Sequence, residues 1–301
     1  MDKASIKETL RGVFAPINTP FDEKGNVDYD GLKENMKTYA ASPMEGYLAL
    51  GSNGENKSLL PEEKRKVLEI IINGKGAHQR VMVGCIAEST LETIMIAKEA
   101  EELGADFITL LSPCYFKSQM TDAVLETYFS DVADAVSKPC LLYNAPQFSG
   151  GIVLSNSLVK KLAQHGNIAG VKDSGSAATV DGYLFNLPND FAVLAGSINF
   201  FIPAMINGAA GGIISLANIF PNESWKLYDL MNKKQYNEAF EYYEKIRRVS
   251  RAVSSRGSIP ATKAAMDVAG LAGGYPRRPL APISDQLKAE IKEIFKAEGM
   301  I

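Results

Sequence analysis

Eight short apolar segments recur at regular intervals along the first 215 residues of this 301-residue chain. They are VFAPI (13–17), GYLAL (46–50), RVMVG (80–84), DFITLL (106–111), PCLLYN (139–144), IAGVK (168–172), FAVLAG (191–196) and GGIIS (211–215). Longer amphipathic stretches with helical spacing lie between them, as at 61–76 and 90–104. Short apolar strands that alternate with helices are typical of βαβ units and of a parallel sheet.

The number of strands favours a (β/α)8 barrel over a doubly wound sheet. A doubly wound sheet more often has five or six strands and a glycine fingerprint after the first, but no GxGxxG follows residues 13–17. From about residue 221 the pattern is helical only. We therefore expect an α/β fold, a TIM (β/α)8 barrel over residues 1–232, with a C-terminal helical extension over 233–301 packed on it.

Local signals support the helices between the strands. Pro61 suits the first turn of a helix, and Gly104 suits a position just after a helix end. We expect Gly76 to close the helix that begins at Pro61 in the same way.

Charge and hydropathy exclude several classes of protein. Lys and Arg number 32 against 35 Asp and Glu, which leaves no basic surface for a nucleic acid or an anionic membrane. No apolar run approaches the ~18 residues of a membrane span, and the N-terminus has no apolar segment typical of a secretory signal. We expect a cytoplasmic protein that acts on a small molecule.

Cysteine and histidine are too scarce for the commonest metal sites. Cys85, Cys114 and Cys140 are an odd number without CxxC spacing, which favours buried thiols over disulfides or a zinc site. His78 and His165 lie in polar or helix-ending contexts, typical of surface or capping histidines. We predict no metal site and no histidine-based catalytic triad.

The candidate site residues follow from the barrel itself, because active sites in such barrels form at the carboxyl ends of the strands. Those positions are occupied by Gly51–Glu55, Ser112–Tyr115, Tyr143–Asn144, Lys172–Ser174 and Gly196–Ser197. A lysine, two tyrosines, small hydroxyls and glycines are thus expected at one mouth.

Lys172 is the most informative of these residues. It ends an apolar strand, so its ammonium is expected in the barrel mouth, where burial would lower its pKa and supply a neutral amine for a Schiff base. The alternative is a solvated lysine paired with Asp173 or another carboxylate. Tyr143 and Tyr115 could instead be core tyrosines, and GSNGE (51–55) could be an ordinary turn rather than an anion-binding loop.

Four motifs in order resemble a known family. GSNGE (51–55), SPCY (112–115), YNxPxxSG (143–150) and GVKDSG (170–175) are similar to the motifs of the pyruvate-dependent class I aldolases, the superfamily of dihydrodipicolinate synthase and N-acetylneuraminate lyase. The similarity extends from about Gly12 to Ile301. It implies a homotetramer (a dimer of dimers) of barrels with helical extensions, and no metal or organic cofactor.

The resemblance implies a role for each matching residue. Lys172 matches the lysine that forms the Schiff base with pyruvate, and Tyr143 matches the tyrosine that moves protons. Ser52 and the Asn53 backbone match the loop that holds the pyruvate carboxylate. Tyr115 matches the tyrosine that crosses a subunit interface to complete a proton relay through the Ser52 position.

Departures from the family pattern bear on the substrate. Dihydrodipicolinate synthases have an arginine for the carboxylate of aspartate semialdehyde where this chain has Phe148, which cannot make that contact. The motifs look most like those of 4-hydroxy-2-oxoglutarate aldolase, in which the Asn53 and Ser174 positions meet the distal part of the substrate. Gly196 and Ser197 complete the predicted binding residues.

The predicted function is reversible cleavage of a 4-hydroxy-2-oxo acid to pyruvate and an aldehyde by a Schiff-base aldolase. The expected partners are pyruvate and an aldehyde or 2-oxo acid. Alternatives within the same chemistry are a sugar-acid aldolase, acting on 2-keto-3-deoxygluconate or N-acetylneuraminate, and 4-hydroxy-tetrahydrodipicolinate synthase. An alternative outside catalysis is a barrel that binds a keto acid as a sensor.

Overall fold

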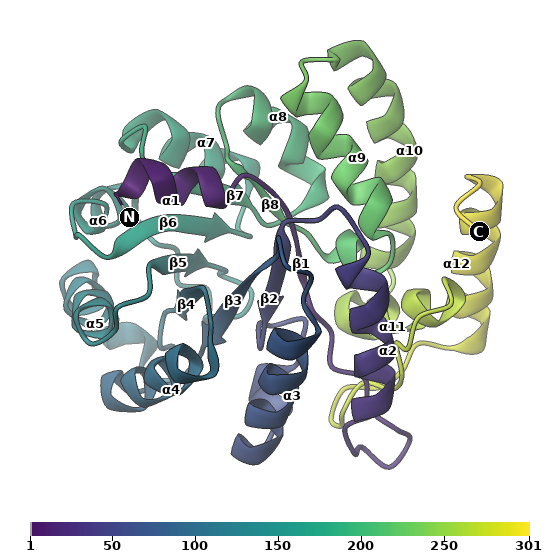
Figure 1. Ribbon diagram of the computed structural model, residues 1–301, viewed down its shortest axis with the longest axis horizontal. Helices are drawn as coiled ribbons and strands as arrows, with labels where there is room; N and C mark the ends of the chain where they lie inside the picture. The colour runs from purple at the N-terminus through teal and green to yellow at the C-terminus, as the bar shows by residue number, and fades with distance from the viewer. Residues whose placement is uncertain (1) are drawn as a thin grey trace.

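Eight parallel strands close into a barrel in the computed structural model, which describes residues 2–301 (Figure 1). The strands are β1 (Gly12–Pro16), β2 (Gly46–Ala49), β3 (Arg80–Cys85), β4 (Phe107–Leu111), β5 (Cys140–Asn144), β6 (Ile168–Asp173), β7 (Ala192–Ala195) and β8 (Gly211–Ile213). Each strand pairs with the next along the chain, and β8 pairs with β1. The predicted (β/α)8 barrel is confirmed.

Helices surround the barrel, as Figure 1 shows. They are α2 (Tyr29–Ala40), α3 (Pro61–Gly74), α4 (Thr90–Leu103), α5 (Asp122–Asp134), α6 (Asn156–Leu162), α7 (Ala177–Asn186), α8 (Phe201–Ile206) and α9 (Pro221–Asn232). Short 3-10 turns lie at η1 (Asn56–Ser58), η2 (Lys117–Gln119), η3 (Ile198–Phe200) and η4 (Ser215–Asn218).

The helix-boundary signals were correct in two of three places. Pro61 begins α3, and Gly104 ends α4 with a left-handed φ of 102°. Gly76 does not close α3, because the helix ends at Gly74 and Lys75 is already extended. Gly76 instead allows its segment to pack closely against the end of α2. Its N–H donates to the Gln79 side chain at 2.8 Å, and a Cβ on Gly76 would lie 3.0 Å from the Ala40 carbonyl oxygen.

The predicted thiols and histidines largely lie where expected. Cys85 and Cys140 are buried, whereas Cys114 is only half-buried, because its loop leaves the barrel toward the surface. His78 is exposed. His165 lies just beyond α6, where its ring accepts the N–H of Asn167 at 3.1 Å.

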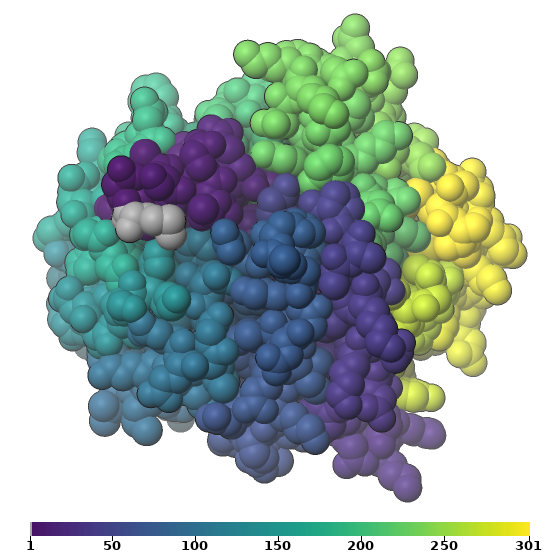
Figure 2. All heavy atoms as spheres, in the orientation of Figure 1, coloured from purple at the N-terminus to yellow at the C-terminus, as the bar shows by residue number. Residues whose placement is uncertain are grey.

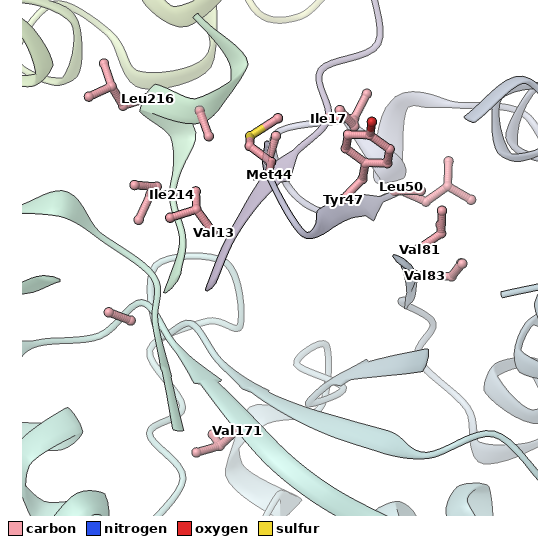
Figure 3. Packing of buried hydrophobic residues seen from close by; sticks show 14 of the residues in the cluster. Val13, Ile17, Met44, Tyr47, Leu50, Val81, Val83, Val171, Ile214 and Leu216 are labelled. Carbon is pink, nitrogen blue, oxygen red and sulfur yellow. The ribbon is translucent and has the colours of Figure 1, made fainter. Parts of the chain in front are cut away.

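Two groups of buried side chains follow from the alternation along each strand. One group, which includes Val13, Val81 and Val83, packs beneath the surrounding helices (Figure 3). The other fills the barrel interior and is formed by Ile6, Leu10, Phe14, Leu48, Met82, Phe107, Leu141, Ala169, Ala192, Leu194, Ala210 and Ile213.

Helix α1 (Lys3–Thr9) covers one end of this interior. Its Ile6 and the following Leu10 are buried against the inward-facing strand residues, and the Lys3 ammonium donates to the carbonyl of Ala163, just beyond α6. Figure 2 shows the side chains of α1 lying against neighbouring parts of the barrel on this face. The carboxyl ends of the strands remain free for a site.

The chain ends in three helices, α10 (Tyr236–Ser254), α11 (Ser258–Val268) and α12 (Asp285–Ala297), in agreement with the predicted helical extension. The boundary at residue 232 stays a prediction, although α9 ends there. Phe295 of α12 is fully buried, with its ring centroid 4.9 Å from that of Phe220. An aromatic pair therefore attaches the last helix to the segment that leads into α9.

Replacing Phe295 with alanine should lower the free energy of unfolding by about 3–5 kcal/mol, because it leaves a cavity between α12 and the barrel. Urea denaturation measures this loss. Lys292→Ala, an exposed position on the same helix, is the matched control and should change stability by no more than about 0.5 kcal/mol. Equal stabilities of the two variants would mean that Phe295 does not anchor α12.

Candidate active site

Lys172 and Tyr143 lie side by side on neighbouring strands at the carboxyl end of the barrel. They are register partners in the β5–β6 pair, and the Lys172 ammonium is 4.2 Å from the centroid of the Tyr143 ring. Lys172 is 2% exposed and Tyr143 is 3% exposed. The structure thus brings together the two residues to which the sequence assigned the central chemistry.

A β-bulge in β6 turns Lys172 toward the interior. Cys140 pairs with Ile168 but Leu141 pairs with Gly170, so Ala169 is an extra residue in β6. Ile168 lies in the outer group of buried residues and Ala169 in the inner group, after which Val171 again faces outward. Unbroken alternation over all residues from Ile168 would place Lys172 on the outer face, but Ala169 and Gly170 together oppose Leu141, which returns Lys172 to the inner face.

Burial lowers the pKa of Lys172, and the adjacent Tyr143 hydroxyl only partly opposes this effect. The alternative of an ion pair with Asp173 does not hold. The Asp173 carboxylate instead accepts the Asn144 side chain at 3.1 Å and the Gly175 N–H at 2.5 Å. Lys172 is therefore a buried amine beside a phenol, as a Schiff-base nucleophile requires.

A cavity of about 260 Å³ opens beside Tyr143. Tyr143 packs with Ile86, Leu111 and Ala145 in a small apolar cluster, and the first two also line the cavity. The other lining residues are Ser52, Glu55, Asn56, Lys57, Ser58, Phe148, Ile259 and Leu280. Phe148, at 39% exposed, forms part of this wall rather than of the core.

The GSNGE turn is held in one conformation from several sides. Leu50 before it and Glu55 at its end both have left-handed backbones, with φ of 52° and 54°. The Glu55 N–H donates to the Ser52 carbonyl at 3.1 Å, and the Asn18 side chain donates to the Asn53 carbonyl at 3.0 Å. Among residues 2–301, the N–H groups of Ser52 and Asn53 have no acceptor, so they are free to meet an anion.

The small residues after β6 and β7 lie against each other. The Gly196 N–H donates to the Asp173 carbonyl at 2.6 Å, and a Cβ on Gly196 would also lie 2.6 Å from that carbonyl oxygen and 2.8 Å from the Ser174 Cα. This contact with backbone atoms requires glycine beside Ser174. The Ser197 hydroxyl accepts the Asn199 N–H at 3.2 Å, so it caps η3.

Tyr115 does not join the other residues within this chain. It is 79% exposed, with its ring packed edge-on against Phe116 at 5.0 Å, which rules out the alternative of a core tyrosine. Its loop is fixed by Glu88, whose carboxylate accepts the N–H groups of Cys114 and Tyr115 at 2.8 and 2.9 Å.

Two features near the site were missed by sequence reasoning. Glu55 and Lys263 form a buried ion pair, and Ile259 and Leu280 bring the C-terminal extension to the cavity wall. The glutamate of GSNGE was a visible signal, because a charged residue inside a short turn has to be paired if it is buried. Nothing in the helical pattern of 258–268 indicated that it reaches the barrel mouth.

Metal-ligand and membrane features are absent from residues 2–301. No group of three or more His, Cys, Asp and Glu side chains in this range could hold a metal ion. No helix in it is long and apolar enough to cross a membrane.

Curated relatives match the chain over almost its full length. A 4-hydroxy-tetrahydrodipicolinate synthase from Methanosarcina mazei is 32% identical, with coverage of 97% of this chain and 99% of the relative. A probable mitochondrial 4-hydroxy-2-oxoglutarate aldolase from Emericella nidulans is also 32% identical, with coverage of 94% and 93%.

Solved structures also match this chain over almost its full length. The chloride-inhibited dihydrodipicolinate synthase from Acinetobacter baumannii, complexed with pyruvate, is 28% identical with a TM-score of 0.91 over 97% of this chain and 100% of that one. A prophage protein of the dihydrodipicolinic acid synthase family from E. coli K12, also in complex with pyruvate, is 26% identical with a TM-score of 0.90 over 97% and 99%. The model of the Dihydrodipicolinate synthetase family matches residues 9–298, and the chain therefore belongs to that family.

Proposed function

We propose that this protein is a class I aldolase that reversibly cleaves a 4-hydroxy-2-oxo acid to pyruvate and an aldehyde. Membership of the family makes it a pyruvate-dependent lyase or synthase. The observation that carries the proposal is the buried Lys172 amine, 4.2 Å from the Tyr143 ring at the mouth of the barrel. A sensor that merely binds a keto acid has no need for such a nucleophile.

The reaction begins when the neutral Lys172 amine attacks the 2-oxo carbon. Loss of water from the resulting carbinolamine gives an iminium. Tyr143 gives its phenolic proton to the departing water in that dehydration, and the resulting phenolate then takes the proton of the C4 hydroxyl. The C3–C4 bond breaks, and its electron pair moves into the iminium to form an enamine while the aldehyde leaves. Protonation of the enamine at C3 and hydrolysis of the iminium release pyruvate and regenerate Lys172.

The pyruvate carboxylate is assigned to the GSNGE turn. The N–H groups of Ser52 and Asn53, which have no acceptor in the part of the chain that the structure describes, and the Ser52 hydroxyl are donors suited to a carboxylate. Two family members solved with pyruvate support pyruvate as the common substrate.

The distal part of the substrate is assigned to Asn53 and Ser174, with Gly196 and Ser197 as further binding residues. Phe148 replaces the arginine that the synthase resemblance requires, which favours a 4-hydroxy-2-oxo acid over aspartate semialdehyde. The aldolase from Emericella nidulans supports this choice, whereas the synthases among the curated relatives favour condensation. Phe148 is the residue that distinguishes the cleavage of a 4-hydroxy-2-oxo acid from the condensation with aspartate semialdehyde.

We also propose that Tyr115 acts in the active site of a second copy. Phe116, which packs against Tyr115, is exposed, and so are Leu91 and Met95 on α4 and Val124 on α5. Large exposed apolar side chains are typical of an interface where they form a patch. If two copies paired through these side chains, the Tyr115 of each copy would complete the proton relay in the active site of the other. Two such pairs would give the expected homotetramer.

The cytoplasmic location of the protein stays a prediction.

Pyruvate with cyanoborohydride should leave one reduced pyruvyl adduct on Lys172, located by peptide mass spectrometry. Because burial lowers the pKa of Lys172 below 10.5, the neutral amine is already populated at lower pH. The trapping rate should rise with pH and level off below pH 10.5. Lys172→Arg should abolish labelling, and a label on another lysine would contradict the assignment.

Replacing Tyr143 with phenylalanine should lower kcat for retro-aldol cleavage by about 100- to 10,000-fold, because the proton relay is lost while the packing of the ring remains. Steady-state release of pyruvate measures this effect. Tyr47→Phe, which removes the hydroxyl of a buried tyrosine that bonds Gln79, is the control and should retain kcat. Equal kcat for the wild type and Tyr143→Phe would exclude the relay.

The wild type should cleave a 4-hydroxy-2-oxo acid with a kcat/KM at least about three orders of magnitude above that for condensing pyruvate with aspartate semialdehyde. The reason is that the semialdehyde carboxylate has no cation at Phe148. Phe148→Arg should shift the ratio toward the semialdehyde. A higher wild-type kcat/KM for the semialdehyde would instead assign the protein as a synthase.

A further inference from the structure

The C-terminal extension is joined to the GSNGE turn by a buried ion pair. The Lys263 ammonium of α11 lies 2.5 Å from one carboxylate oxygen of Glu55, and the two side chains are 0% and 1% exposed. Glu55 is the last residue of the turn that carries Ser52 and Asn53. The two partners are 208 residues apart in sequence, since 263 exceeds 55 by that number.

The remaining polar atoms of the pair are also bonded across the same junction. The second carboxylate oxygen of Glu55 accepts the Arg277 backbone N–H at 2.9 Å. The Lys263 ammonium donates to the Tyr275 carbonyl at 2.7 Å and lies 4.3 Å from the centroid of the Phe21 ring. Both sides of the junction are therefore fixed by charge-assisted contacts, which are stronger than neutral ones in a dry environment.

The Glu55 backbone makes the turn dependent on this pair. Its φ of 54° is left-handed, which costs energy for a residue other than glycine and persists only where surrounding contacts enforce it. The same residue closes the turn by donating its N–H to the Ser52 carbonyl at 3.1 Å. A change in the position of Glu55 would therefore be transmitted directly to the donors at Ser52 and Asn53.

The extension also reaches the cavity itself. Ile259, one turn before Lys263 on α11, lines the cavity together with Ser52 and Phe148. A shift of α11 would thus alter both the cavity wall and the anchor of the turn.

We propose that Lys263 is a positioning residue that holds Glu55, and through it the Ser52–Asn53 turn, in the geometry that binds the substrate's 2-oxo-acid carboxylate. This inference rests on the proposed function. It assigns to the C-terminal extension a direct part in pyruvate affinity, in addition to its packing on the barrel.

The test measures the pyruvate concentration that gives half-maximal labelling of Lys172 by cyanoborohydride. In Lys263→Met this concentration should rise by about 10- to 100-fold, because the turn is displaced. The labelling reached at saturating pyruvate should stay within about threefold of the wild type, since the carboxylate contact affects pyruvate binding and not the Lys172 nucleophile.

Arg256→Met is the matched control. Arg256, in the turn between α10 and α11, is paired with Glu290 on α12 at 3.1 Å, so this ion pair also joins parts of the extension but does not touch the GSNGE turn. The pyruvate concentration that gives half-maximal labelling of this variant should equal that of the wild type, even if its Tm falls. An unchanged half-saturation in Lys263→Met, with only a lower Tm, would overturn the proposal.

A double variant covers the case in which Lys263→Met does not fold because Glu55 is left as a buried, unpaired charge. Glu55→Gln with Lys263→Met removes both charges, and its half-saturation should also rise by about tenfold or more. Wild-type half-saturation in the folded double variant would overturn the proposal. Failure to label the wild-type protein would refute the proposed function instead, so the two failures are distinct.

Discussion

The removal of one lysine amine from water is the constraint on which the site depends. An ammonium buried without a carboxylate loses its hydration and gains little in return, so burial favours the neutral form of Lys172. The barrel provides this environment because its interior is filled with apolar side chains up to the level of Tyr143. Closure of the opposite end by α1 completes the enclosure and leaves one mouth for the substrate.

Much of the architecture could be predicted because it rests on local patterns. Alternation of apolar strands with amphipathic helices predicts a (β/α)8 barrel, and the ends of the strands then give Lys172, Tyr143 and Ser52 as candidate site residues. What could not be predicted depends on pairing between distant segments. The bulge at Ala169 is visible only in the register with β5, although it decides which face Lys172 takes. Gly76 was misread as a helix end because close packing and left-handed turns both select glycine.

Contacts between distant segments also explain the features near the site that the sequence did not reveal. The pairing of Glu55 with Lys263 requires the extension to fold back over the barrel mouth, which no local pattern encodes. Tyr115 is 79% exposed in a single chain, and by our proposal an assembly of copies explains that exposure. By our proposal the barrel supplies the nucleophile, and residues from the extension and from a second copy complete its surroundings.

The most direct test of the central claim needs no knowledge of the aldehyde. An iminium on Lys172 that interconverts with its enamine will exchange the methyl protons of pyruvate for solvent deuterons. Proton NMR of pyruvate in D₂O with catalytic enzyme measures this exchange. The account predicts rapid loss of the methyl signal with the wild type and none above background with Lys172→Arg. Equal exchange by the two proteins, or none by the wild type, would contradict it.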